Sequence, residues 1–354
     1  MVAVGSVPAA VAEDGYELWL RYAPLSEPPK SAARHAMAAC SNPSDTLRAA
    51  LDEIDRATEA MLGAGLPRTD MLEGGTLVLA SPDCSDALTG LPLPPEAQVG
   101  TEGFVIREIR HSGRQVTLIS ARSDIGVLYG TFDYLLRMAR GEELTGVNIL
   151  SRPKTKLRLL NHWDNLDRHV ERGYSGQSIW DWHRLPGYLD PKYTDYARAN
   201  ASIGINGVSL TNVNADATVL TPHYLEKVAA LADVFRPYGI KVYLTARFSA
   251  PMELDGLPTA DPRDAAVQAW WQAKVDEIYT RVPDFGGFLV KANSEGQPGP
   301  QDYGRSHAEG ANMLARALAP HNGKVMWRAF VYSAEEPEDR VKQAYTEFVP
   351  LDGQ

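Results

Sequence analysis

The sequence predicts an α/β protein in two parts: an N-terminal mixed α/β domain over residues 1–150 and a second domain of repeated strand–helix units over residues 151–354. Three observations predict this class. The chain has 354 residues, which is enough for two domains with a core each. Apolar residues make up 44% of it, as in ordinary globular proteins. Beyond residue 151, apolar runs typical of strands covered on both faces alternate with amphipathic helical stretches.

The elements of the first domain follow from local patterns. A helix is predicted to begin at Asn42-Pro43, because a capping side chain precedes a proline and leucines recur at helical spacing afterwards. Ser123 is predicted to cap a second helix. Strands are predicted at residues 16–22, 76–80, 104–110 and 115–120, the last two joined by a turn at Ser112-Gly113. This domain contains no catalytic motif.

The second domain repeats a strand followed by a helix. Strands are predicted at residues 156–162, 206–212, 240–246, 287–292 and 324–331. Helices are predicted near Thr194, from Thr221-Pro222, from Asp261-Pro262, over residues 307–318 and over residues 339–347, with a possible sixth strand from Phe348. Repeated units of this kind form either a doubly wound open sheet or a (β/α)₈ barrel, and five or six strands are fewer than a closed barrel needs.

Charge and cysteine content limit the function classes. Lys and Arg number 35 and Asp and Glu 45, so the formal net charge is −10, which disfavours nucleic acid as a partner. No segment is apolar enough to span a membrane, and residues 1–12 lack the positive charge of a secretory signal. A cytoplasmic location is therefore predicted. Cys40 and Cys84 are expected to be free thiols, as is usual in that compartment.

Several well-known site motifs are absent from the sequence. It contains no GxxxxGK[ST] phosphate loop, no GxGxxG after a strand, no HExxH and no GxSxG. The eight histidines are scattered, with no pair at ligand spacing on a predicted helix. We therefore predict neither a metal nor an organic cofactor.

Polar and aromatic residues follow each predicted strand of the second domain. Function in βα folds is concentrated where parallel strands end, so these segments are the candidate site. Five such segments at one edge are more than solvated loops alone would explain. They are residues 161–165, 211–214, 247–249, 291–296 and 327–328.

Glu295 is the candidate general acid. It follows an apolar strand and precedes Gly-Gln-Pro-Gly-Pro, a stretch stiff enough to hold it in place. At an apolar barrel mouth, desolvation would raise the pKa of its carboxyl group and keep it protonated for acid catalysis. A glutamate on a surface loop fits the same pattern, and spacing alone does not separate the two interpretations.

Two cations and several indoles suggest the substrate. Lys291 and Arg328 end neighbouring strands and could bind an anionic group together, although ion pairs with nearby acids are an equal alternative. Trp163, Trp180 and Trp182 could stack on sugars, whereas core packing is the stronger interpretation for the last two. An acid, two cations and indoles together suggest a carbohydrate that carries a carboxylate.

Four longer segments carry a family resemblance. They are NHWDNLDRHVERGYSG (161–176), INGVSLTNVNA (205–215), PDFGGFLVKANSEGQPGPQDYGR (283–305) and VMWRAFVY (325–332). Together they closely resemble the bacterial α-glucuronidases of glycoside hydrolase family 67. The likeness extends from EDGYELWLRYAPL at residues 13–25 to FVPLDG at residues 348–353.

The resemblance implies a fold and an activity. In this family an N-terminal α/β domain precedes a (β/α)₈ TIM barrel and a helical C-terminal region through which many members dimerise. The barrel in this chain would then be incomplete, with about five to six of eight βα units. The implied activity removes glucuronic or 4-O-methylglucuronic acid from xylo-oligosaccharides with inversion, a step in xylan degradation.

The resemblance also implies roles for single residues. Glu295 in KANSEG matches the family's general acid, and Lys291 and Arg328 match residues that hold the uronate carboxylate. Trp163 matches an indole that packs on the sugar, and Val213 matches a residue near the 4-O-methyl group.

The general base is expected outside the chain. An inverting glycosidase needs a second carboxylate roughly 6.5–9.5 Å from the first. In the family the candidate Asp and Glu lie beyond the PLDG segment, so Asp352 is not expected to be the base. We therefore expect an N-terminal portion that is inactive alone. The alternatives are a non-catalytic fragment that binds uronate or xylo-oligosaccharide, and a sugar-phosphate aldolase or isomerase, which the motif match opposes.

Overall fold

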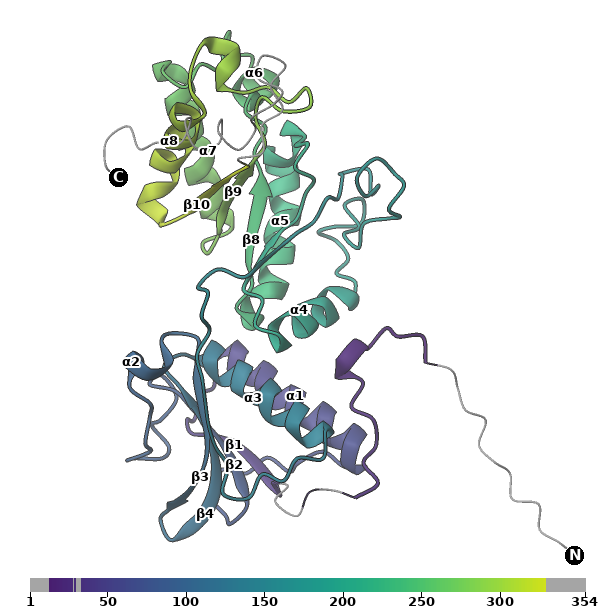
Figure 1. The fold of residues 1–354 in the computed structure, drawn as a ribbon, viewed down its shortest axis with the longest axis vertical. Coiled ribbons are helices and arrows are strands. Elements are labelled where there is room, and N and C mark those ends of the chain that lie inside the picture. Colours follow the sequence, from purple (N-terminus) through teal and green to yellow (C-terminus); the bar gives the residue numbers. More distant parts are fainter. Residues whose placement is uncertain (1–12, 28, 30–32, 329–354) are drawn as a thin grey trace, which may run out of the picture.

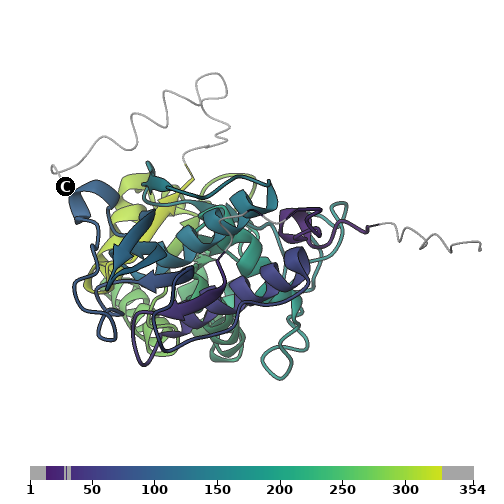
Figure 2. The same ribbon diagram turned by 90° about the horizontal axis from the view of Figure 1, so that it is seen from below.

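The computed structural model describes residues 13–27, 29 and 33–328, and it confirms the α/β class (Figure 1). Its two five-stranded sheets lie in two parts of the molecule that follow one another along its longest axis. Seen from below, the purple and blue first domain lies in front of the green second domain (Figure 2). The predicted helix over residues 339–347 and the strand from Phe348 lie outside the described residues.

The first sheet is mixed, with the strand order β1-β2-β4-β3-β5. Strands β1, β2 and β4 are parallel, and β3 is antiparallel to both β4 and β5. The predicted turn at Ser112-Gly113 is confirmed, and both residues have the positive φ of a tight hairpin turn. The strands are β1 (His35–Ala38), β2 (Thr76–Ala80), β3 (Phe104–His111), β4 (Arg114–Ala121) and β5 (Asn148–Ser151).

Helices α1 (Asp45–Leu62) and α3 (Asp124–Ala139) lie side by side against this sheet (Figure 1). Their buried faces form one core with the sheet, and a short helix, α2 (Glu96–Val99), precedes β3. Ser123 caps α3 as predicted, by accepting from the Gly126 N–H at 3.2 Å. Helix α1 begins later than predicted, because Ser44 rather than Asn42 is its capping residue.

The strand predicted at residues 16–22 was wrong. Residues Leu18–Leu20 form a 3₁₀ turn, η1. The Trp19 Nε1 donates to Ser202 at 2.7 Å and the Tyr22 hydroxyl donates to Glu53 at 2.8 Å, so this segment is tied to helices of both domains. Alternating polarity here reflects side chains that bind different helices, not the two faces of a sheet.

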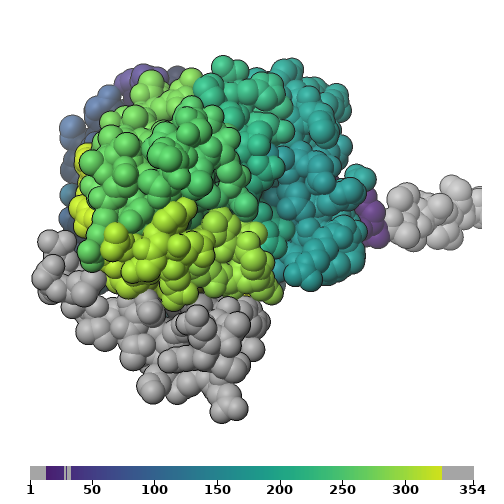
Figure 3. All heavy atoms as spheres, turned by 90° about the horizontal axis from the view of Figure 1, so that it is seen from above, coloured from purple at the N-terminus to yellow at the C-terminus, as the bar shows by residue number. Residues whose placement is uncertain are grey.

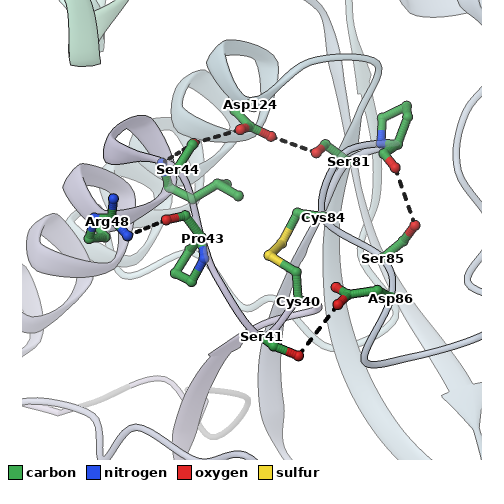
Figure 4. Close-up of a disulfide and its surroundings, with 12 residues drawn as sticks. Cys40, Ser41, Pro43, Ser44, Arg48, Ser81, Cys84, Ser85, Asp86 and Asp124 are labelled. Carbon is green, nitrogen blue, oxygen red and sulfur yellow. Dashed lines mark hydrogen bonds between the residues drawn. A yellow bond between two sulfur atoms is a disulfide. The ribbon is translucent and has the colours of Figure 1, made fainter.

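The prediction of two free thiols was also wrong. Cys40 follows β1 and Cys84 follows β2, and they form a disulfide with a Cα–Cα distance of 4.7 Å (Figure 4). The two cysteines are 44 residues apart in sequence and become neighbours only because β1 and β2 pair in parallel. The same corner is held by Asp124, whose carboxylate accepts from Ser44 at 2.6 Å and from Ser81 at 2.5 Å.

The second sheet is entirely parallel, with the order β10-β9-β8-β7-β6, and it curls like part of a barrel. The three inner strands are almost completely buried, whereas β6 and β10 at its edges are largely half-buried or exposed. All five strands were predicted, with bounds a few residues too wide. They are β6 (Leu159–Asn161), β7 (Gly207–Ser209), β8 (Lys241–Thr245), β9 (Gly287–Val290) and β10 (Lys324–Trp327).

Helices pack on the second sheet and share its core. Phe235 of α5, Trp271 of α7 and Leu314 of α8 are fully buried together with Phe288 of β9. The starts of α5 and α8 are as predicted. Helix α7 begins at Ala265 rather than at Asp261-Pro262, because the Asp264 side chain caps it. The helices are α4 (Lys192–Ser202), α5 (Pro222–Phe235), α6 (Ala250–Asp255), α7 (Ala265–Arg281) and α8 (His307–Leu318).

Four short 3₁₀ turns connect these helices and strands. They are η2 (Ala217–Leu220), η3 (Arg236–Tyr238), η4 (Pro300–Tyr303) and η5 (Ala319–His321). Within the described ranges, none of the helices is both long and apolar enough to cross a membrane.

Candidate active site

The carboxyl ends of β6 to β10 lie at one edge of the second sheet, because all five strands are parallel. Trp163, Val213, Lys291 and Arg328 each follow one of these strands by four residues or fewer. From above, teal and yellow-green parts of the chain that are distant in sequence adjoin on one face (Figure 3). The topology alone therefore brings the predicted site residues to one edge.

Lys291 lies at the centre of the candidate site. It directly follows β9, and only 1% of its side chain is exposed. Its Nζ donates to the Glu295 carboxylate and, at 2.7 Å, to Oδ1 of Asn214 in the loop after β7. A buried ammonium group needs such acceptors, and these two come from different loops.

The electrostatics of Glu295 differ from the sequence prediction. Burial was expected to raise the pKa of this carboxyl group. Instead, its hydrogen bond with Lys291 lowers the pKa, and the charges of Lys291, Arg328 and Arg172 act in the same direction. The side chain is 40% exposed, so desolvation is the weaker effect. Without substrate, Glu295 is therefore held as a carboxylate.

The loop that carries Glu295 is held by side-chain hydrogen bonds. Asn293 and Glu295 both have positive φ, at 46° and 50°. The Asn293 Nδ2 donates to Asp302 at 2.9 Å, and its Oδ1 accepts from the Gln301 N–H at 2.9 Å. Backbone conformations of this kind persist only where surrounding contacts enforce them, and they are frequent at functional sites.

Arg328 and Trp163 meet across the open side of the sheet. The Arg328 guanidinium carbon lies 5.8 Å from the centroid of the Trp163 ring, which is within range for a cation–π contact. Trp163 is half-buried, so part of the indole remains accessible. Since Arg328 also acts electrostatically on Glu295, the structure brings Trp163, Lys291, Glu295 and Arg328 together.

The remaining sequence candidates are buried. Val213 is 3% exposed and lies in sequence between Asn212 and Asn214, two asparagines that belong to the site. Trp180 and Trp182 are at most 1% exposed and belong to the core of the second domain, as does Trp271. The packing interpretation is therefore confirmed for Trp180 and Trp182.

Sequence reasoning missed the role of the asparagines. The Asn212 Nδ2 donates to Oδ1 of Asn165 at 3.1 Å, and Asn212 Oδ1 accepts from the Asn214 N–H at 2.9 Å. These three amides line a cavity of about 310 Å³ at the ends of β6 and β7. The repeated asparagines just after two strands could have marked these residues as part of the site. Their connection to Lys291, however, depends on the fold.

Acidic, cysteine and histidine side chains do not assemble into a metal site in the described part of the chain. No group of three or more His, Cys, Asp or Glu residues there is arranged to hold an ion. The candidate site combines a carboxylate, two cations, amides and an indole.

Known protein families and relatives match nearly the whole chain. The sequence model described as "Glycosyl hydrolase family 67 N-terminus" matches residues 18–134, and that of the "Glycosyl hydrolase family 67 middle domain" matches residues 137–354. A "Probable alpha-glucuronidase A" from Aspergillus clavatus is 40% identical over 99% of this chain. An "Alpha-glucuronidase A" from Emericella nidulans is 39% identical over 98% of it. In both cases the chain spans only 42% of the relative's own length.

Solved structures of low sequence identity share the fold. A family GH115 4-O-methyl-α-glucuronidase superposes with a TM-score of 0.53 at 13% identity, covering 83% of this chain and 40% of its own. The GH20 β-N-acetylhexosaminidase from Streptomyces coelicolor gives a TM-score of 0.52 at 15% identity, covering 88% of this chain and 66% of its own. The fold of most of this chain thus recurs in these two solved structures.

Proposed function

Since the chain belongs to glycosyl hydrolase family 67, we propose that it is the part of an α-glucuronidase that carries the general acid and the uronate-binding residues. The proposed reaction is inverting hydrolysis of the α-1,2 bond that joins glucuronic or 4-O-methylglucuronic acid to xylo-oligosaccharides. The observation that carries the proposal is the pair of cations, Lys291 and Arg328, beside Glu295 and Trp163.

Each residue has a part in this reaction. Lys291 and Arg328 bind the sugar carboxylate, because two fixed cations match a group with two charged oxygens. The indole of Trp163 packs on the apolar face of the sugar, and Val213 lies near the 4-O-methyl group. Protonated Glu295 gives its proton to the glycosidic oxygen while the bond between that oxygen and the anomeric carbon breaks.

The same step also needs a base. In an inverting mechanism a carboxylate about 6.5–9.5 Å from the acid takes a proton from the water that attacks the anomeric carbon. The family resemblance points to an Asp and a Glu that follow the PLDG segment. The proposal therefore assigns no base among the residues that the structure describes.

We further propose that the curled sheet is part of an eight-stranded barrel. Its outer strands β6 and β10 are much less buried than β7 to β9, as expected where further strands join. The relatives are more than twice as long as this chain, since it spans 42% of them, and this leaves sequence for the missing units. A homodimer formed through a C-terminal region remains a prediction from the resemblance.

The disulfide bears on the cellular location. A disulfide such as Cys40–Cys84 is typical of oxidising compartments and rare in the cytosol. The disulfide therefore weighs against the cytoplasmic location expected from the sequence.

Binding tests the proposed pocket directly. We expect the purified chain to bind methyl α-D-glucuronide in calorimetry, and we expect Arg328→Ala to weaken that binding at least tenfold. Methyl α-D-glucoside, which lacks the carboxylate, serves as the control ligand. Equal affinity for the two sugars would contradict the assignment of the cations.

Hydrolysis tests the activity. An aldouronic acid is incubated with this chain and with a protein in which the chain is continued by the remaining length of its relatives, and NMR follows the anomer that is released. We expect the longer protein to release glucuronic acid with an inverted configuration at the anomeric carbon. Binding without release by either protein would support the alternative of a uronate-binding module, and turnover by this chain alone would show that its base lies within it.

A further inference from the structure

The ammonium group of Lys291 has one hydrogen more than it has partners among the residues that the structure describes. Three hydrogens are available, and the acceptors are the Glu295 carboxylate and Asn214 Oδ1. The described residues provide no third hydrogen bond to this ammonium group. One position on a buried cation therefore remains for an incoming anionic group.

The two partners of Lys291 differ in how firmly they are held. The Asn214 N–H donates to the side chain of Asn212, which is 3% exposed. Asn212 in turn donates to Asn165 of the loop after β6. Asn165 is fixed by the carbonyl groups of His169 and Glu171, at 3.0 and 2.7 Å. Glu295, in contrast, is 40% exposed. Asn214 is thus the fixed partner and Glu295 the one that can leave.

The roles proposed above place two carboxylates on the same cation. The carboxylate of the sugar and the carboxylate of Glu295 both need Lys291, and two like charges so close to each other disfavour the ionised form of one of them. In the described part of the chain, the charged groups that act on Glu295 are Lys291, Arg328 and Arg172. A sugar carboxylate on Lys291 and Arg328 would remove the main attraction and add a repulsion.

We propose that Lys291 exchanges partners when substrate binds: the sugar carboxylate displaces Glu295 from the ammonium group, Asn214 keeps Lys291 in place, and Glu295 takes up a proton from solvent. This inference rests on the proposed function. Glu295 is then an acid only while a uronate occupies the site, and after it has given its proton to the leaving oxygen it can bind Lys291 again. The carboxylate of the substrate thus causes Glu295 to become protonated and also holds the sugar in the site.

The exchange makes binding depend on pH in a defined direction. Glu295 is ionised in the empty site because the nearby cations lower its pKa, and it becomes protonated in the complex. Binding therefore takes up about one proton in the interval between the pKa values of the empty and the occupied site. In that interval the affinity for glucuronide falls as pH rises, by up to about tenfold per pH unit.

Calorimetry measures directly how many protons are taken up when the sugar binds. Methyl α-D-glucuronide is titrated into the chain at one pH in phosphate and in imidazole, whose ionisation enthalpies differ, and the difference in binding heat gives the number of protons exchanged. We expect uptake of about one proton per sugar bound. Glu295→Gln is expected to bind the sugar without uptake. Glu59→Gln, which changes an exposed carboxylate on α1, is the matched control and should behave like the unaltered chain.

The outcomes separate this inference from the proposed function. Glucuronide binding without proton uptake by the unaltered chain would overturn the exchange and leave the α-glucuronidase proposal intact. Binding with uptake, but no hydrolysis by the extended protein, would overturn the activity alone. Failure of a folded sample, verified by circular dichroism, to bind glucuronide would overturn both. Uptake that persists in Glu295→Gln would assign the proton to another group and reject the exchange.

Discussion

Arg198 of α4 and Glu53 of α1 form a buried ion pair that joins the two domains. The Arg198 Nε donates to Oε2 of Glu53 at 2.7 Å, and its Nη2 donates to Oε1 at 3.0 Å. The side chains are 9% and 3% exposed. The Tyr22 hydroxyl adds a third hydrogen bond to Glu53, and both burial and the Glu53 charge raise the pKa of that tyrosine. Every oxygen of the carboxylate is therefore used.

Removing one member of this pair should destabilise the fold. Glu53→Ala leaves the Arg198 guanidinium buried without its main partner, so the free energy of unfolding in urea should fall by about 3–5 kcal/mol. The exposed pair that Asp55 of the same helix forms with Arg68, which lies beyond the end of α1, is the control, and Asp55→Ala should cost less than about 1 kcal/mol. Similar losses for the two variants would show that burial is not the cause.

Reduction of the disulfide should also lower stability. The Cys40–Cys84 bond closes a loop with a sequence separation of 44 residues, and loss of that constraint on the unfolded chain is worth about 3–4 kcal/mol in the chain-entropy account. Urea unfolding with and without dithiothreitol measures it. The double variant Cys40→Ser/Cys84→Ser should be insensitive to reductant. Detection of two free thiols per unfolded, unreduced chain would rule the bond out.

Asn214 should affect uronate binding without touching the sugar. Asn214→Ala removes the fixed acceptor of Lys291, and we expect methyl α-D-glucuronide to bind about tenfold more weakly, as for the loss of one charge-assisted hydrogen bond. Asn214→Asp should weaken binding further, because a second carboxylate would hold the ammonium group. Asn148→Ala, an exposed asparagine of β5, is the matched control. Equal affinity of Asn214→Ala and this control would contradict the positioning role.

Gly299 is predicted to be essential for the loop that carries Glu295. A Cβ at this position would lie 2.1 Å from Oδ1 of Asn293 and 2.7 Å from its backbone nitrogen, so Gly299→Ala must displace the loop. We expect a loss of about 1–3 kcal/mol and faster hydrogen exchange over residues 293–302. Gly74→Ala, where a Cβ meets open space, is the control. Unchanged exchange in Gly299→Ala would show that the loop is not held as described.

Elements with strong local signals were predictable. The bounds of β2 were predicted to the residue, because an apolar run fully buried on both faces leaves little ambiguity. Helix α8 was also predicted to the residue, and Ser306 and Glu309 form a capping box at its start. The strand prediction for residues 16–22 was wrong because the alternating pattern there comes from tertiary contacts. Trp19, for example, donates a hydrogen bond to Ser202 of α4.

Part of the candidate site was predictable for a related reason. In parallel βα units the residues after each strand share one edge, so Lys291, Glu295, Arg328 and Trp163 could be named from the order of strands and the family motifs. The asparagines after β6 and β7 fell in the same segments, but nothing in the sequence distinguished a partner of Lys291 from an ordinary loop amide.

The amino-acid sequence alone determined the α/β class, the repeated parallel units and the identity of the residues at the strand ends, because hydrophobic periodicity and capping act over a few residues. Only the tertiary structure decided that Cys40 bonds Cys84, that Asn214 reaches Lys291, and that the pKa of Glu295 is lowered rather than raised. These outcomes depend on distances between side chains from different strands and loops. Electrostatic and covalent pairing follow such distances, and only the folded chain sets them.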